Sequence, residues 1–345
     1  MKRPSEGSQS KDGTISRREL LKGVACGGLV LIGAAGALPA CAPLVGEAEE
    51  SSPARGEAPS YPLPTDEGRW APPVAHAGRL PSDQGEIHIG DIGTFIFDAG
   101  RVETVRPDIF RPGHFSLFDI LVHLSMAGDI ALDYHFDAAV DTHVIDALDG
   151  ERGWWYSAHY SAGWFEPNVF RMDLYPYKNN TVVRLDPGRE DRIAGVHDSF
   201  RKEVQRLAAN GGRVIIPELA IRAPGGRVTF QDVVVTPHDL RSDVLQPGVV
   251  TALDAIISLA EMGQISNLAL TWYERIAGAD PVDSYWVEHI NDDAAGGGCG
   301  FVYESGPREF AGFSGTHIHI PADVRVTVSP EYALWFWICL GRGGL

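Results

Sequence analysis

The pair His317 and His319 has the spacing of two metal ligands on one strand. Residues i and i+2 of a strand point to the same face, so both imidazoles can reach one metal ion. Two ligands alone do not hold a metal tightly, and solvent-facing histidines on a sheet are the other interpretation. The side chains that could complete a site are Glu288, His289, Asp292 and Asp293, although nothing in the sequence places them nearby.

A second group of residues with chemical potential is aromatic, with six rings between positions 154 and 165. On a strand, adjacent tryptophans point to opposite faces, so one of Trp154 and Trp155 is expected outside the core. Exposed rings of this kind suit a flat apolar ligand, the face of a sugar or a partner protein. The alternative is that most of them fill a small core. The candidate ligand-binding residues are Trp154, Trp155, Tyr156, Tyr160 and Trp164.

The cysteines Cys299 and Cys339 are the only two beyond position 41. In an oxidising compartment they are expected to form a disulfide, and two separate buried thiols are the alternative. A nucleophilic Cys299 would need a neighbouring base, which only an unverified contact with His289 or His317 could supply.

Sequence patterns of common catalytic sites are missing from the chain. The glycine run 296–300 lacks the Lys-Ser/Thr of a phosphate-binding loop and precedes a strand-like segment. Nucleophile-elbow, dinucleotide-binding, zinc-finger and haem-attachment patterns are absent as well. A non-catalytic protein is therefore favoured over an enzyme.

The N-terminal 40 residues have the order of an export signal. Ser16-Arg17-Arg18-Glu19-Leu20-Leu21-Lys22 resembles the twin-arginine motif, and a mildly apolar stretch, 23–37, follows it. Leu38-Pro39-Ala40-Cys41 then resembles the cleavage site of a lipoprotein, with Cys41 as the lipidated first residue of the mature chain. An ordinary signal peptide with a chance cysteine is the alternative. The expected location is the periplasm or the outer face of the cell membrane.

The mature chain is expected to be strongly acidic. Without residues 1–40 it keeps 23 basic and 43 acidic side chains, a formal net charge of −20. Nucleic acid is a poor partner for such a surface. Residues 41–85 are rich in Pro, Ser, Gly and Glu without apolar periodicity, and predict a flexible tether.

An internal duplication organises the rest of the chain. Segment 112–130 lies over segment 247–265 without a gap, at a constant offset of 135 residues, with six identical positions. The pairs Ser116/Asp119 and Thr251/Asp254 have the capping-box spacing, so each copy predicts the start of an amphipathic helix. The residues predicted to end these two helices are Gly128 and Gly263. Chance similarity of two short amphipathic helices is the alternative.

The repeated unit, a strand, a turn, a capped helix and three or four strands around an aromatic, resembles the transcobalamin-like C-terminal domain family. The resemblance rests on the helix start 116–121, the aromatic strand 154–156 and Ala322-Asp323-Val324, and covers about 86–190 and 213–340. It implies a corrinoid or another planar small molecule as a candidate ligand, or a role as an attachment module. The second copy has Gly300-Phe301 in place of the tryptophan, which weakens a ligand role there.

The fold class predicted from these features is α+β, with two tandem small β-grasp-like domains, each a mainly antiparallel sheet with one capped helix. The expected segments are a signal peptide (1–40), a tether (41–85), a first repeat (86–192), a connecting helix (193–212) and a second repeat (213–345).

The function expected from the sequence is that of a membrane-anchored extracytoplasmic lipoprotein that binds a small ligand or a partner protein. Two alternatives stay open: a metal-dependent redox or electron-transfer protein that uses His317 and His319, and a structural subunit of a membrane-associated complex. The sequence names no cofactor, and cobalamin or a bound metal are the candidates.

Overall fold

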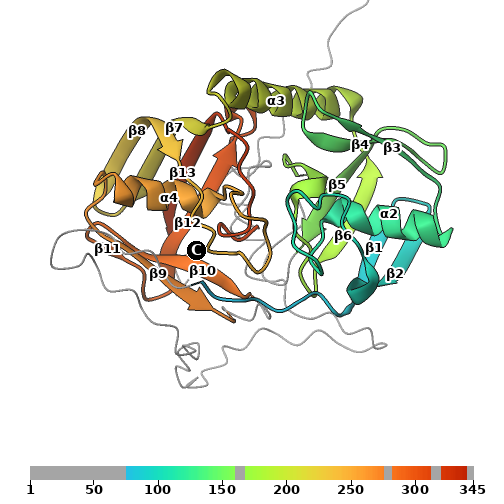
Figure 1. Ribbon diagram of the computed structural model, residues 1–345, viewed down its shortest axis with the longest axis horizontal. Coiled ribbons are helices and arrows are strands. Elements are labelled where there is room, and N and C mark those ends of the chain that lie inside the picture. Colours follow the sequence, from blue (N-terminus) through green and yellow to red (C-terminus); the bar gives the residue numbers. More distant parts are fainter. Residues whose placement is uncertain (1–74, 160–167, 276–281, 312–319, 340–345) are drawn as a thin grey trace, which may run out of the picture. The chain divides into compact units, whose positions relative to one another are not determined.

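The computed structural model describes residues 75–159, 168–275, 282–311 and 320–339 (Figure 1). The predicted signal peptide, Cys41 and the tether up to residue 74 lie outside these residues. Residues 75–85, assigned to the tether from sequence, belong to the folded unit. Gly78 N donates to Asp243 Oδ2 at 2.7 Å, His76 stacks on Trp272 at 5.1 Å, and the first strand begins at Gln84.

Each repeat forms one four-stranded sheet. The strands of the first sheet are β1 (Gln84–Ile89), β2 (Gly93–Asp98), β5 (Trp154–His159) and β6 (Val182–Pro187). The strands of the second sheet are β7 (Val214–Ala223), β8 (Gly226–Val235), β12 (Cys299–Gly306) and β13 (Tyr332–Cys339). The strand orders, β2-β1-β6-β5 and β8-β7-β13-β12, correspond strand for strand. In both sheets the central pair is parallel and the outer pairs are antiparallel.

One helix follows the hairpin of each repeat, namely α2 (Leu117–Ala127) and α4 (Ala252–Glu261). A smaller antiparallel sheet comes next. Its strands are β3 (Leu132–Asp137) and β4 (Thr142–Leu148) in the first repeat, and β9 (Leu268–Tyr273), β10 (Ser284–Ile290) and β11 (Asp293–Ala294) in the second. The short 3₁₀ turns are η1 (Ala99–Arg101), η2 (Met172–Leu174) and η3 (Arg308–Phe310). A hairpin, a helix and a last strand returning parallel to the first form a β-grasp arrangement, so the predicted fold class is confirmed.

Both helices start with the capping box that the sequence predicts. Ser116 N donates to Asp119 Oδ2, and Thr251 N donates to Asp254 Oδ2, each at 2.6 Å. The first helix ends at Gly128, whose φ of 83° is left-handed. In the second helix Met262 is the cap, and the left-handed residue, Gly263 with φ of 67°, follows it.

A 20-residue helix, α3 (Glu190–Ala209), connects the two repeats. It begins three residues before the segment predicted from sequence, because Glu190 and Asp191 belong to its first turn, where acidic side chains interact favourably with the helix dipole.

The two repeats meet through equivalent residues. Phe110 and Leu245, 135 residues apart, form an antiparallel bridge. Arg111 N donates to Val244 O at 2.9 Å, and Gln246 N donates to Ile109 O at 2.8 Å. Each of these residues also lies 135 positions from its counterpart, so the contact is reciprocal. The same patch on both partners is the mark of a two-fold interface, which here lies within one chain.

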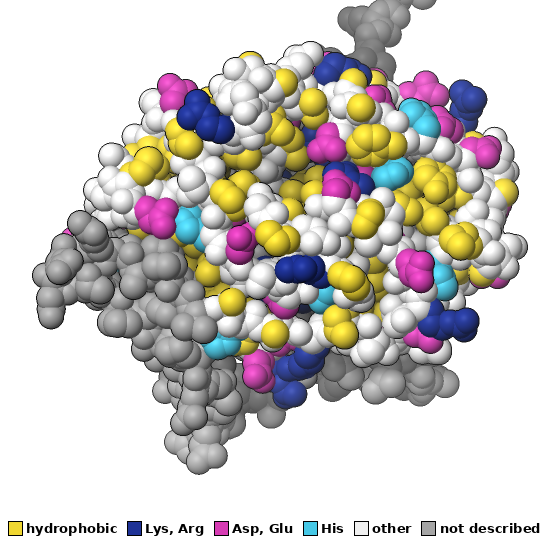
Figure 2. Space-filling model, in the orientation of Figure 1, with side chains coloured by type: hydrophobic (Ala, Val, Ile, Leu, Met, Phe, Trp, Pro, Cys, Tyr) yellow, Lys and Arg dark blue, Asp and Glu magenta, His cyan; other side chains and the backbone are white. Residues whose placement is uncertain are grey.

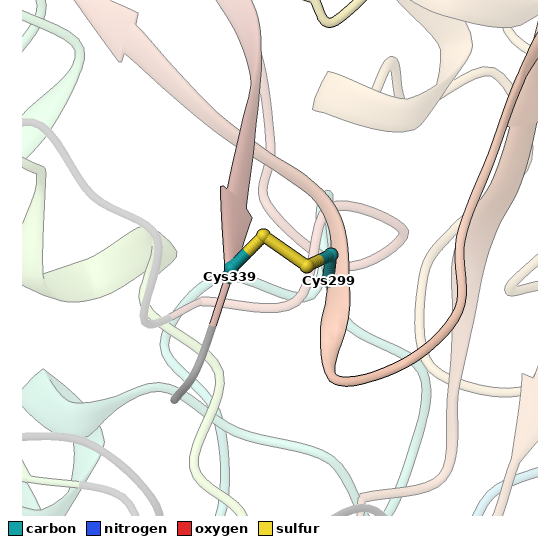
Figure 3. The surroundings of a disulfide bond; sticks show 2 residues. All are labelled: Cys299 and Cys339. Atoms are coloured by element: carbon teal, nitrogen blue, oxygen red, sulfur yellow. A yellow bond between two sulfur atoms is a disulfide. The ribbon is translucent and has the colours of Figure 1, made fainter. Parts of the chain in front are cut away.

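A disulfide closes the second sheet between Cys299 on β12 and Cys339 on β13 (Figure 3). The two residues face each other in the antiparallel register, with their Cα atoms 3.9 Å apart. The bond therefore links the first residue of β12 to the last of β13.

Candidate functional site

A cavity of about 300 Å³ lies in the first repeat, between the strands β4 and β5 and the helix α3. Its volume is at the lower end of the range of small-molecule sites. Aromatic and aliphatic side chains dominate the wall, together with Arg171, Glu190 and two histidines. The residues of the wall are Phe118, Thr142, His143, Val144, Ile145, Gly153, Trp154, Trp155, Tyr156, Arg171, Met172, Glu190, Ile193, Ala194, His197 and Phe200.

Three of the candidate ligand-binding residues line this cavity. Trp154 and Tyr156 are buried in the core of the first repeat, whereas Trp155 is only partly buried, so the two tryptophans differ as the strand geometry predicts. The Trp155 indole donates to Asn168 O at 2.6 Å and lies edge-on to His197 at 5.7 Å. Trp155 is therefore the ring most accessible to a ligand.

Helix α3 supplies the wall opposite β5, and this is the part of the cavity that the sequence did not predict. Ile193, His197 and Phe200 are spaced i, i+4 and i+7, so they share one face of the helix. That spacing was visible in the sequence, but only the fold shows that this face covers the aromatic strand. Burial lowers the pKa of His197, so its imidazole is neutral at neutral pH.

Arg171 fixes α3 to the first repeat at the cavity. Its guanidinium lies 4.4 Å above the Phe200 ring, with Nη1 2.6 Å from Glu203 Oε2. Nε and Nη2 donate to Val140 O and Phe200 O at 2.8 and 3.2 Å. The side chain is buried and fully engaged, so it serves the structure of the wall.

His143 places a polar nitrogen in the wall. Its Nδ1 lies 2.9 Å from Asp173 Oδ2, and its ring stacks on Phe118 at 5.1 Å. Because Nδ1 contacts Asp173, the other ring nitrogen, Nε2, can form a hydrogen bond with a ligand. Phe136 and Tyr134, both exposed, contact the same imidazole from β3. The cavity thus combines stacking surfaces with one fixed hydrogen-bonding group.

A buried ion network holds His143 in place. Burial alone would raise the pKa of Asp173, but hydrogen bonds from His143 and Thr142 and the charge of Arg106 outweigh it and hold that pKa below its usual value. Arg106 Nη1 lies 3.0 Å from Asp173 Oδ2, and Thr142 Oγ1 donates to Asp173 Oδ1 at 2.5 Å. Asp173 therefore stays ionised at neutral pH.

The second repeat contains the same network. Arg241 Nη1 lies 2.9 Å from Asp323 Oδ2, and Ser284 Oγ donates to Asp323 Oδ1 at 2.7 Å. In place of a histidine ring, Tyr285 contributes only its backbone N–H, at 3.0 Å. The second small cavity, at this network, has a volume of about 10 Å³. The network is therefore common to both repeats, and in the first repeat an imidazole and a cavity of about 300 Å³ accompany it.

The second repeat has a pH-sensitive group of its own, His238. Its Nδ1 lies 2.9 Å from Asp254 Oδ1 and its Nε2 lies 2.9 Å from Glu261 Oε2. Burial alone would lower the pKa of His238, but the two carboxylates outweigh it and raise that pKa above 6.5.

Replacement of His238 by glutamine is expected to cost more stability at about pH 5.5 than at about pH 9. The folded chain holds this proton more tightly than the unfolded chain, so the contribution is complete below the unfolded pKa and is lost as pH rises through the raised one. Urea unfolding at the two pH values measures the difference. Glu261→Gln should shrink the pH dependence in the wild-type background, and equal losses at both pH values would contradict the assignment.

The other sequence candidates, Tyr160, Trp164, His317, His319 and Cys41, lie outside the described residues. Within the described ranges, no group of three or more His, Cys, Asp or Glu side chains is arranged to hold a metal ion. No helix in that part of the chain is both long and apolar enough to cross a membrane. On the face drawn in Figure 2, charges of both signs are interspersed with hydrophobic side chains.

The fold and the cavity define a protein of tandem β-grasp-like repeats with a cavity in the first repeat. Comparison with known proteins finds no matching protein-family model, no matching curated protein and no matching solved structure.

Proposed function

We propose that the chain is an exported, lipid-anchored binding protein whose first repeat holds a small planar ligand between the aromatic strand β5 and the helix α3. The observation that carries this proposal is the cavity of about 300 Å³, with Trp155 and His143 in its wall. Aromatic surfaces and a few fixed polar groups are typical of small-molecule sites. The motif at Cys41 supports attachment to the outer face of a membrane, with export by the twin-arginine pathway.

The cavity volume favours a ligand of one or two fused rings. A whole corrinoid is much larger than about 300 Å³, so a corrinoid would insert only one edge or side group. The resemblance to transcobalamin-like domains keeps cobalamin as a specific compound to test. The proposal assigns no catalytic step, because the sequence lacks the patterns of common catalytic sites and Arg171 is fully engaged in the structure of the wall.

The test uses the mature chain without its lipid and two probes, 1-anilinonaphthalene-8-sulfonate and cyanocobalamin. Ala194 is an exposed residue of α3 at the wall of the cavity. Ala194→Trp is expected to fill the entrance and weaken probe binding at least tenfold, as measured by fluorescence titration or calorimetry. The matched control is Ala208→Trp, which places the same ring on an exposed position of the same helix outside the cavity.

Equal affinities of the Ala194→Trp and Ala208→Trp variants would show that the probe binds elsewhere. Absence of binding by both probes would exclude the planar-ligand function and leave a partner protein as the object of binding. Because Ala194 is exposed, its replacement is not expected to unfold the chain, and thermal unfolding of the variant checks this.

A further inference from the structure

Arg325 is a buried cation for which the described part of the chain supplies no acidic partner. Only 4% of its surface is exposed. Its Nη1 is buried and has no hydrogen-bond partner, and no carboxylate of the described residues lies within 4.0 Å of its charged nitrogens. The other buried arginines, Arg106, Arg171 and Arg241, all pair with carboxylates. Arg325 therefore departs from the pattern of the rest of the molecule.

The surroundings of Arg325 are aromatic and come from both repeats. The guanidinium lies 4.7 Å from the centre of the Phe170 ring and 6.0 Å from that of Tyr303. Its Nη2 donates to Ser305 O at 2.6 Å. The Tyr303 hydroxyl donates to Ile320 O. The charge thus rests against ring faces, one carbonyl and the Tyr303 hydroxyl, while Nη1 has no hydrogen-bond partner among the described residues.

Comparison of the two repeats shows that the first repeat has no cation at the position equivalent to Arg325. Leu117 N donates to Tyr175 O, and Ala252 N donates to Arg325 O, each at 2.9 Å, so Tyr175 and Arg325 occupy equivalent positions. The buried Tyr175 packs against the Phe170 ring, at 6.5 Å, that Arg325 also covers. One repeat therefore presents a neutral ring, and the other a positive charge, to the same shared core.

A buried ionised group that lacks a partner of opposite charge destabilises the folded state. Ring faces recover only part of that cost, and an arginine cannot deprotonate to avoid it. We infer that Nη1 of Arg325 binds one oxygen of a small oxyanion, a carboxylate or a phosphate, enclosed between the two repeats. This site is separate from the cavity beside Trp155 and does not depend on the function proposed for it.

The test measures thermal unfolding of the mature chain while sodium chloride is replaced stepwise by sodium phosphate or sodium acetate at constant ionic strength. A ligand that binds only the folded state raises the midpoint in a saturable manner. We expect a saturable rise with at least one of the two anions in the wild type, and no rise in Arg325→Met. A response to phosphate alone assigns a phosphate site, and a response to acetate alone assigns a carboxylate site.

The matched control is Arg222→Met, since Arg222 also lies over an aromatic ring, that of Phe336, but is exposed. This variant is expected to keep the full anion response. If Arg325→Met does not fold, Arg325→Lys, which keeps the charge and loses the fork, should weaken the response. Absence of a saturable rise in the wild type with both anions, or the same rise in the Arg325 variant, would overturn the inference.

Discussion

Replacement of Asp323 by alanine is expected to lower the free energy of unfolding by about 3 to 5 kcal/mol, because it removes one partner of a buried ion pair. Asp323 accepts hydrogen bonds from Arg241, Ser284 and the Tyr285 backbone, at 2.7 to 3.0 Å. Its loss leaves the buried guanidinium with Asp243 as its remaining carboxylate partner and removes the acceptor of the Tyr285 N–H. Urea unfolding monitored by tryptophan fluorescence measures the change.

Two further variants isolate the cause of that loss. The double replacement Arg241→Met/Asp323→Leu removes both charges and is expected to recover at least half of the stability. Asp191→Ala, which breaks an exposed pair with Arg189 and removes one acidic side chain from the first turn of α3, is expected to lower the unfolding midpoint only slightly. A loss for Asp323→Ala no larger than that for Asp191→Ala would mean that the network contributes little to stability.

Removal of the disulfide in Cys299→Ala/Cys339→Ala is expected to lower the free energy of unfolding by about 2 to 4 kcal/mol. The two cysteines are 40 residues apart, and the bond restricts the unfolded chain between them. Guanidinium unfolding of the oxidised wild type and the double variant measures the loss.

Reductant supplies the control for this prediction. The wild type in dithiothreitol should unfold at the midpoint of the double variant, and the double variant should not respond to dithiothreitol. A double variant as stable as the oxidised wild type would contradict the prediction. The expected export by the twin-arginine pathway, which carries folded proteins, requires that the chain fold before the disulfide forms, since thiols stay reduced in the cytoplasm. The reduced chain must then still be folded at physiological temperature.

The sequence predicted the fold because its signals are local. The capping boxes at Ser116 and Thr251, and the gap-free window around them, mark equivalent helices. The aromatic strand 154–156 and its counterpart 301–303 then mark equivalent strands. The strand registers agree with this equivalence, because Tyr156 pairs with Leu185 in the first sheet and Tyr303 pairs with Trp335 in the second. Periodicity and caps describe such elements well.

The site was harder to predict, because its parts come from distant segments. The offset between repeats grows from 135 residues at Arg106 and Arg241 to 150 at Asp173 and Asp323, so no gap-free comparison links the carboxylates to their arginines. One signal was present: the Arg-x-Asp triplets at 106–108 and 241–243 recur at the offset of the helices. The position of α3 over β5, and the lone charge of Arg325, depend on packing alone.

The order of strands in the two sheets also determines when each sheet can form during synthesis. In each sheet a central strand, β6 or β13, is the last to be made. The first sheet can close once residues 182–187 have left the ribosome, whereas the second must wait for residues 332–339. Pairing of β7 with β13 spans more than 100 residues, a long-range contact of the kind that slows folding. The hairpin β7–β8 therefore stays without its parallel partner strand until β13 has been made.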